Sequence, residues 1–128
     1  PLILDFIISK HIFTAVINQI DYVNNVDEAA RTFADGLDCE VLSKKAMSWL
    51  NENVKNSDDL EHVTLAIRRQ WPNSLTKALV SSKFNTQNLK LSLDTPKDLE
   101  DIRSYFHNRE FRMKKAFNDY GFRMVFEL

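Results

Sequence analysis

The sequence contains few of the residues that interrupt or cross-link a chain. Among its 128 residues are two glycines, three prolines and one cysteine, Cys39. A single cysteine cannot form an internal disulfide and leaves no Cys/Cys or Cys/His metal pattern, so the chain fits a reducing compartment and is predicted to be cytoplasmic. The scarcity of glycine and proline excludes long linkers, and a chain of this length is typical of one domain.

Signatures of several binding classes are also missing. Neither G-x-G-x-x-G nor G-x-x-x-x-G-K-[ST] occurs, which excludes a Rossmann fingerprint and a P-loop. The 17 Lys and Arg residues nearly balance the 18 Asp and Glu residues, and this argues against a nucleic-acid-binding surface. The most apolar stretch, ILDFIISKHIFTAVINQI, is interrupted by Asp5, Lys10 and His11, so it predicts a buried helix rather than a membrane span or a signal sequence.

The first part of the chain is predicted to alternate one helix with short strands. Apolar residues at helical spacing predict a helix over 5–19 that packs on a sheet. A short strand is expected at 22–23, followed by a polar loop over 24–36. The alternation over 37–42 predicts another strand with one buried face. That face carries Leu37, Cys39 and Val41, and the other face carries Asp38, Glu40 and Leu42.

Two helices are predicted next. Ser43 can cap a helix of which one side carries Ala46, Met47, Leu50 and Val54. Asp58 and Glu61 have the spacing of a capping box for a second helix, which Pro72 ends. The apolar residues of that second helix are Leu60, Val63, Ala66 and Ile67.

The last predicted elements are two strands and a helix. Strands are expected at 77–82 and 89–93. Thr95 and Asp98 form a T-x-x-D capping box around a proline at the first helical position, which predicts a helix over about 96–107. Alternating helices and short strands indicate an α/β layered domain with helices against a mixed sheet.

Asp94 stands at the junction between the last strand and the last helix. Open α/β sheets bind ligands at the carboxyl ends of their strands, and a Mg²⁺ site needs only one or two carboxylates beside phosphate oxygens. Asp94 is therefore a candidate metal ligand. In a second interpretation, which the local pattern alone favours, Asp94 supports the turn and interacts with the following helix N-terminus.

A second candidate group is DGLDCE, residues 35–40. Its three carboxylates, beside a glycine, could line a polar pocket and bind a hydroxylated ligand through charge-assisted hydrogen bonds. Asp38 and Glu40 could equally form the solvated face of an edge strand, after an Asp35-Gly36 turn. The spacing does not favour either interpretation.

The third candidate is the pair Glu61 and His62. An adjacent acid and histidine could carry out acid–base chemistry or bind a ligand. A capping glutamate next to a partly buried histidine explains the same pattern, and the sequence favours this second interpretation.

Four stretches, taken in order, resemble one enzyme family. They are PLILDFIISKHIFTAVINQIDYVNN, ADGLDCEVLSKKAM, DLEHVTLAIRR and LKLSLDTPKDLEDIRSYF. Together they are similar to the carboxyl-terminal half of cytidylyltransferases of the spore coat polysaccharide biosynthesis protein F type, which group with the acylneuraminate (CMP-sugar) cytidylyltransferases. The resemblance covers residues 1–106 and implies a partial nucleotide-diphospho-sugar transferase-like fold. The tail over 107–128 has no counterpart, and we expect it to form a helix and a strand that pack on this domain.

The resemblance also implies an activity and a set of site residues. Such enzymes transfer CMP from CTP to a sugar in the biosynthesis of surface polysaccharides and glycoconjugates, with Mg²⁺ as cofactor. The expected partners are thus CTP, a sugar acceptor and a second copy of the chain, but neither nucleic acid nor a membrane. The family's metal-binding aspartate falls on Asp94. The substrate-binding candidates are Asp35, Gly36, Asp38, Glu40, Glu61 and His62.

The chain departs from the family pattern in two ways. A second metal-binding aspartate would lie two residues before Pro1, and Leu60, Leu65 and Ala66 replace the arginine, proline and tyrosine of E-R-E-H-V-T-P-Y. We therefore expect the chain to be inactive by itself. The alternative is a non-catalytic module that dimerises or binds a partner, in which a second copy covers a sheet face left open by the missing half.

Overall fold

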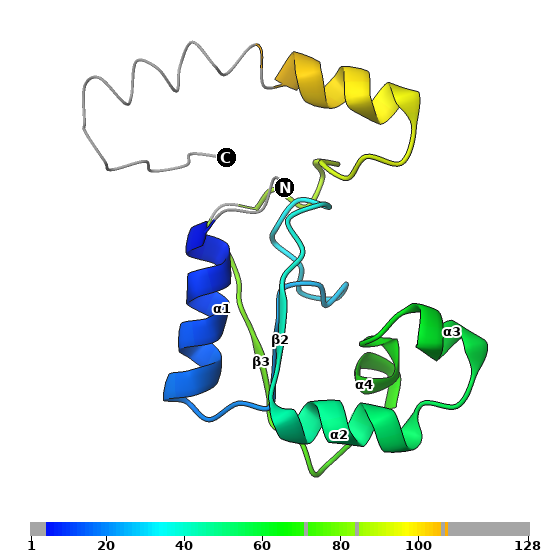
Figure 1. Cartoon of the computed structure of the whole chain (residues 1–128). Helices are drawn as coiled ribbons and strands as arrows, with labels where there is room; N and C mark the ends of the chain where they lie inside the picture. Colours follow the sequence, from blue (N-terminus) through cyan, green and yellow to red (C-terminus); the bar gives the residue numbers. More distant parts are fainter. Residues whose placement is uncertain (1–4, 71, 84, 106, 108–128) are drawn as a thin grey trace.

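The computed structural model describes residues 5–70, 72–83, 85–105 and 107. Its helices and strands are α1 (Asp5–Ile17), β1 (Tyr22–Asn24), β2 (Glu40–Leu42), α2 (Lys44–Asn53), α3 (Ser57–Glu61), α4 (Leu65–Gln70) and β3 (Lys77–Leu79). A further helix occupies 96–105 (Figure 1). The strands form a sheet of order β2-β1-β3, in which β1 is antiparallel to β2 and parallel to β3. The predicted α/β domain with a mixed sheet is confirmed.

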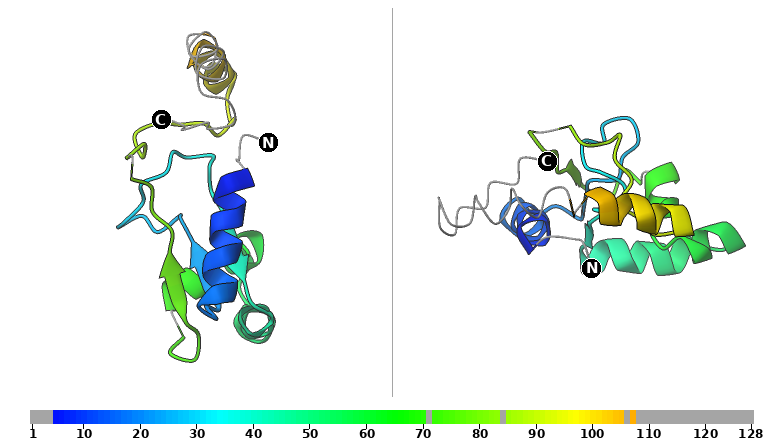
Figure 2. Two further views of the ribbon diagram at one scale, coloured as in Figure 1. Left: turned by 90° about the vertical axis from the view of Figure 1, so that its left-hand side faces the viewer. Right: turned by 90° about the horizontal axis from the view of Figure 1, so that it is seen from above.

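Helices cover both faces of this sheet (Figures 1 and 2). Successive residues of the central strand point to opposite faces, and both Tyr22 and Val23 are fully buried. Val23 packs in a cluster with Ile7 of α1, whereas Tyr22 packs with residues of α2 and α4. The prediction of an open sheet face is therefore wrong for β1. Among the described residues, most of the large exposed apolar side chains lie on α1.

The amino-terminal helix packs on the sheet as predicted, but the prediction that it is buried is wrong, because most of its large apolar side chains are exposed. Ile7 and His11, one turn apart, are its buried residues on the sheet side. The helix ends at Ile17, and Gln19 adopts a φ of 50°, in the left-handed region that ends helices. The predicted boundary at 19 is thus two residues too late.

The two helices after β2 differ from the prediction in several places. Ser43 caps α2 as expected, because its side chain accepts a hydrogen bond from the Ala46 amide, but Met47 is exposed. The single helix expected from Asp58 to Pro72 is split into α3 and α4. As a result, its apolar residues Leu60 and Val63 are exposed.

The capping residue of α3 is not the predicted one. Asn56 Oδ1 accepts from the Asp59 amide at 2.8 Å, and Asn56 Nδ2 donates to Asp59 Oδ2 at 2.6 Å. Asn56 therefore caps α3 in place of Asp58. Asparagine and aspartate are comparably good capping residues, so the sequence offered two starts two residues apart, and local spacing did not distinguish them.

The last helix begins where the capping box predicts. The Asp98 amide donates to Thr95 Oγ1 at 3.2 Å, and the Thr95 amide donates to Asp98 Oδ2 at 2.7 Å. The strand expected at 89–93 is reduced, within the described part of the chain, to one isolated parallel bridge between Asp35 and Lys90. The predicted tail falls outside the described residues apart from position 107. In the described segments no helix has the length and apolarity needed to cross a membrane.

Candidate functional site

Two segments distant in sequence meet at one end of the sheet. The Asp35 amide donates to Leu89 O at 3.1 Å, and the Leu91 amide donates to Asp35 O at 2.7 Å. The strands β1 and β3 are parallel, and both segments lie beyond their carboxyl ends (Figure 1). This is the end at which open α/β sheets usually bind ligands.

Gly36 makes the close approach of these segments possible. Its φ is +93°, which L side chains rarely adopt. A Cβ atom at this position would lie 2.5 Å from both the Leu91 carbonyl carbon and the Ser92 nitrogen. Any other residue would therefore push the two segments apart. The substrate-pocket prediction for Gly36 is not tested by this geometry, which instead gives it a positioning role.

Asp35 and Asp94, both predicted site residues, meet at one hydroxyl group. Ser92 Oγ lies 3.2 Å from Asp94 Oδ2 and also forms a short hydrogen bond with Asp35 Oδ2. A hydroxyl carries one proton, so Ser92 can donate to one of these carboxylates at a time. The structure thus brings together two acidic side chains that lie far apart in sequence.

Lys90 pairs with the carboxylate of Asp94. Its Nζ lies 2.9 Å from Asp94 Oδ2 and 3.0 Å from Asp98 Oδ2. The Asp94 side chain is 64% exposed. The hydrogen bond from Lys90, followed by the one from Ser92, lowers the pKa of Asp94. Asp94 is therefore a solvent-accessible, ionised carboxylate with a cationic partner.

Arg31, which sequence reasoning missed, organises the DGLDCE loop. It donates to Phe33 O at 3.0 Å and to Ala34 O at 3.1 Å. It also pairs with Asp38 and lies 3.6 Å from Asp35 Oδ1. Burial raises the pKa of Asp38, although the guanidinium of Arg31 opposes this effect. The available signal was an arginine four residues before an aspartate, but the local pattern did not reveal that the chain folds back here.

Asn25 is a second residue that sequence reasoning missed. Its buried amide donates to Leu37 O at 2.9 Å and accepts from the Cys39 amide at 2.8 Å. The Asn25 side chain thus satisfies backbone groups of the segment just before β2, which would otherwise need a neighbouring strand as partner. The only signal in the sequence was an asparagine shortly after the predicted strand at 22–23.

Glu40 belongs to a different environment from Asp35 and Asp94. Its carboxylate accepts hydrogen bonds from the Tyr22 hydroxyl and, at 3.0 Å, from Thr64 Oγ1. Burial, together with the bond to Glu40, raises the pKa of Tyr22. Glu40 therefore links the sheet to the start of α4 and does not lie on a solvated strand face. The bend at 62–64 that splits the predicted helix brings Thr64 to this bond.

Glu61 and His62 are both exposed at the end of α3. The expected capping and partly buried roles are therefore not observed for this pair. In the part of the chain that the structure describes, no three His, Cys, Asp or Glu side chains are grouped so that they could hold a metal ion. Asp35 and Asp94 are nevertheless hard oxygen ligands of the kind that Mg²⁺ takes, and one or two carboxylates suffice beside phosphate oxygens. Their chemistry fits part of a magnesium site.

Comparisons with known proteins agree with this fold. No family model matches the chain, and no curated protein matches it. A solved cytidylyltransferase from Leptospira borgpetersenii serovar Hardjo-bovis (strain JB197) superimposes with a TM-score of 0.76 at 22% identity, over 84% of this chain and 45% of that one. The chain therefore has the fold of that part of a cytidylyltransferase and spans less than half of its length.

Proposed function

We propose that the chain is part of a nucleotidyltransferase that transfers CMP from CTP to a sugar in the biosynthesis of surface polysaccharides or glycoconjugates. The observation that carries the proposal is the meeting of Asp35 and Asp94 at Ser92, beyond the carboxyl ends of β1 and β3. The four family-like stretches and the fold shared with a solved cytidylyltransferase support it. The single, buried Cys39 supports a cytoplasmic location.

On this proposal Asp94, with Asp35 beside it, holds a magnesium ion. When bound, Mg²⁺ would offset negative charge on the phosphate oxygens of CTP. Ser92 lies between the two carboxylates and can donate its proton to either of them, and Gly36 keeps the two segments close enough for that contact. Phosphoryl transfer depends mainly on positioning and electrostatics, which is what these residues provide.

The sugar acceptor would lie on the side of the DGLDCE loop. Arg31 fixes the Asp38 carboxylate, which can accept charge-assisted hydrogen bonds from sugar hydroxyls. Glu40 would support this pocket through its bonds to the sheet and to α4. Glu61 and His62 are exposed and open to a substrate. Because the chain spans 45% of the solved cytidylyltransferase, we propose that the 128 residues alone are inactive.

The test is pyrophosphate release from CTP, with Mg²⁺ and a panel of sugar acids and sugar phosphates, by the full product of the gene that encodes this chain. We expect Asp94→Asn to lower kcat by roughly 10²–10³-fold, a loss typical of a lost electrostatic contact to the transition state. Asp101→Asn removes the same charge from the exposed pair with Lys97 and should leave activity unchanged. Full activity of Asp94→Asn would remove the metal assignment, and turnover by the 128 residues alone would refute their inactivity.

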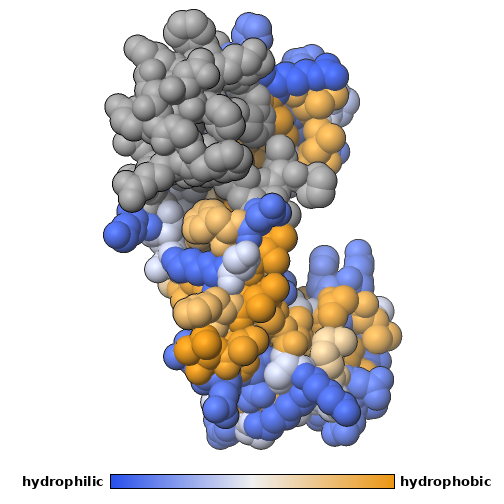
Figure 3. Space-filling view, turned by 60° about the vertical axis from the view of Figure 1, so that its left-hand side comes forward, coloured by the Kyte–Doolittle hydropathy of each residue, from blue (hydrophilic) through white to orange (hydrophobic). Residues whose placement is uncertain are grey.

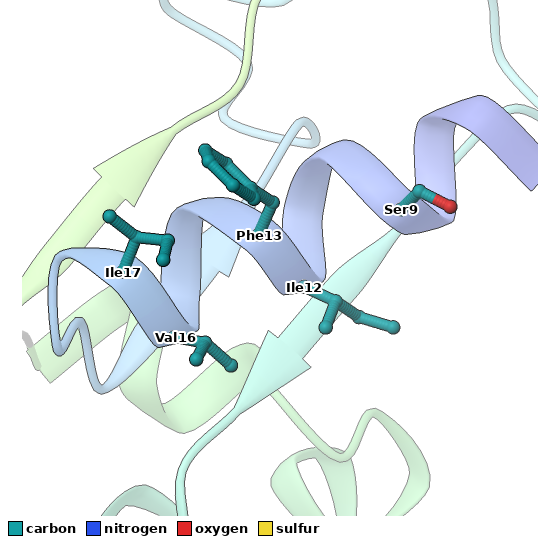
Figure 4. Close-up of a pocket in the computed structure, with 5 residues that line it drawn as sticks. All are labelled: Ser9, Ile12, Phe13, Val16 and Ile17. Atoms are coloured by element: carbon teal, nitrogen blue, oxygen red, sulfur yellow. The ribbon is translucent and has the colours of Figure 1, made fainter.

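A second candidate function, dimerisation, is favoured by the outer face of α1. Figure 3 shows apolar residues gathered over this helix, and Figure 4 shows the side chains that line an open hollow along it. The hollow is lined by Ser9, Ile12, Phe13, Val16 and Ile17. Phe13 is 65% exposed and Val16 is 68% exposed. Apolar side chains this exposed, and this close together, mark an interaction surface.

We propose that a second copy of the chain occupies this face. Phe6, Ser9, Phe13 and Val16 follow the alternating three- and four-residue spacing of a helix–helix seam. The small Ser9 allows two helices to approach, and these four residues carry no charge that would need a complementary partner. A standard interface buries roughly 800 Å² per partner, which is more than one face of a single helix offers, so the dimer should be weak.

Sedimentation velocity over a range of concentrations tests this second proposal. The wild-type chain should show a concentration-dependent dimer, and Phe13→Glu should abolish it because a charge cannot be buried in the seam. Met47→Glu, which places the same charge on the exposed side of α2, is the matched control and should dimerise normally. A wild-type chain that stays monomeric at every concentration would contradict the proposal.

A further inference from the structure

Lys90 occupies an unusual position among the charged residues of the site. Its ammonium group bridges two carboxylates, 2.9 Å from Asp94 Oδ2 and 3.0 Å from Asp98 Oδ2. The first of these carboxylates is the proposed metal ligand, and the second belongs to the capping box of the following helix. Within the described residues, the ammonium of Lys90 is therefore the positive charge that neutralises Asp94.

We propose that Lys90 is a built-in counter-ion that competes with a divalent cation for Asp94 and is released when the cation binds. This inference rests on the proposed function and assigns a role to a residue that does not itself bind metal. Two positive charges cannot both lie close to one carboxylate without repelling each other. Each must therefore weaken the binding of the other, and by the same factor.

Breaking the ion pair between Lys90 and Asp94 should require little free energy. Both partners of the Lys90–Asp94 pair are exposed, at 47% and 64% of their side chains, and exposed ion pairs are weak. Ser92 Oγ lies 3.2 Å from Asp94 Oδ2 and can donate to it whenever its proton is not on Asp35, so an orienting donor stays within reach of Asp94 when Lys90 leaves.

Lys90 can stay paired with Asp98 when it leaves Asp94. The Asp98 side chain is fixed by the amides of Asp94 and Thr95, at 3.1 Å and 2.7 Å. These bonds, unlike the ion pair, belong to the helix cap and do not depend on a cation. Lys90 can therefore keep its contact with Asp98 while Asp94 turns to the metal.

The experiment measures Mn²⁺ affinity of the 128-residue chain by water-proton relaxation, which does not depend on activity. We expect Lys90→Met to lower the Kd for Mn²⁺ by about two- to fivefold, the range for removal of an exposed ion pair. Lys97→Met is the matched control. Lys97 forms an exposed pair with Asp101 on the same helix, so its removal changes net charge equally without touching Asp94.

A second readout follows Lys90 itself. Its rate of acetylation by an amine-reactive reagent, determined by mass spectrometry, should rise when Mn²⁺ is added, and that of Lys97 should not. Equal Kd changes in Lys90→Met and Lys97→Met, or no Mn²⁺ binding to Lys90→Met at millimolar concentrations, would overturn the inference. If Asp94→Asn binds Mn²⁺ as tightly as wild type, the metal assignment in the proposed function fails as well, which separates the two failures.

Discussion

Glu40 and Asp94 both come from stretches that resemble the same enzyme family, yet they lie in opposite environments. Glu40 accepts hydrogen bonds from two hydroxyl groups, and one of them belongs to the fully buried Tyr22. Asp94 is mostly exposed and pairs with the ammonium of Lys90. Buried neutral donors cannot be withdrawn without leaving a polar group unsatisfied, whereas an exposed ion pair rearranges at little cost. Glu40 is therefore a structural residue, and Asp94 is available to a ligand.

The largest expected effect comes from removing the structural carboxylate. Glu40→Ala leaves the Tyr22 hydroxyl buried without this acceptor and removes the partner of Thr64. We expect the free energy of unfolding to fall by about 3 kcal/mol, measured by urea denaturation. Asp94→Ala should cause a much smaller loss. Comparable losses of unfolding free energy in the two variants would contradict the distinction between a structural Glu40 and a ligand-accessible Asp94.

A smaller loss of stability should follow from disturbing the backbone beneath Asp94. Gly36→Ala places a methyl group against the backbone of Leu91 and Ser92 at a positive φ. We expect a destabilisation of about 2 kcal/mol. The amide resonances of Asp35 and Ser92 should shift more than that of Glu40. A variant with wild-type stability and an unchanged spectrum would show that this close approach does not hold the site together.

Features specified by neighbouring residues could be predicted from the sequence. The Thr95–Asp98 capping box, the Ser43 cap and the existence of the first helix all depend on residues within one or two turns, and all are confirmed, although the first helix is not buried as predicted. The choice between Asn56 and Asp58 as a cap was not predictable, because both satisfy the same local pattern. The α/β class followed from the order of these elements.

Contacts between distant segments could not be predicted in this way. The hydrogen bond between Ser92 and Asp35 joins residues 57 positions apart, and the one between Thr64 and Glu40 joins residues 24 positions apart. Periodicity places a side chain on a face but does not show what covers that face. Glu40 therefore seemed equally compatible with solvent and with a pocket. The roles of Asn25 and Arg31 in fixing the DGLDCE loop were missed for the same reason.

The smallest expected effect is on the pH dependence of stability. It arises from the hydrogen bond between Tyr22 and Glu40. Burial and the bond to Glu40 raise the pKa of Tyr22, so the folded chain holds this proton more tightly than the unfolded chain. The resulting stabilisation is fully present below the ordinary tyrosine value of about 10 and is lost as pH rises above it. Urea midpoints measured across this range should fall, and Tyr22→Phe should flatten the decline. An identical decline in Tyr22→Phe would contradict the role given to the hydrogen bond between Tyr22 and Glu40.

The account is tested most directly by an NMR titration of the ¹⁵N-labelled chain with Mn²⁺, which broadens the amide resonances nearest to the ion. We predict that Asp35, Ser92 and Asp94 broaden first, that Glu40 and His62 stay sharp at the same concentration, and that Asp94→Asn removes the effect. Broadening centred on Glu40 or on His62, with Asp94 unaffected, would contradict the assignment of Asp94 as the ligand-binding carboxylate and of Glu40 as the structural one.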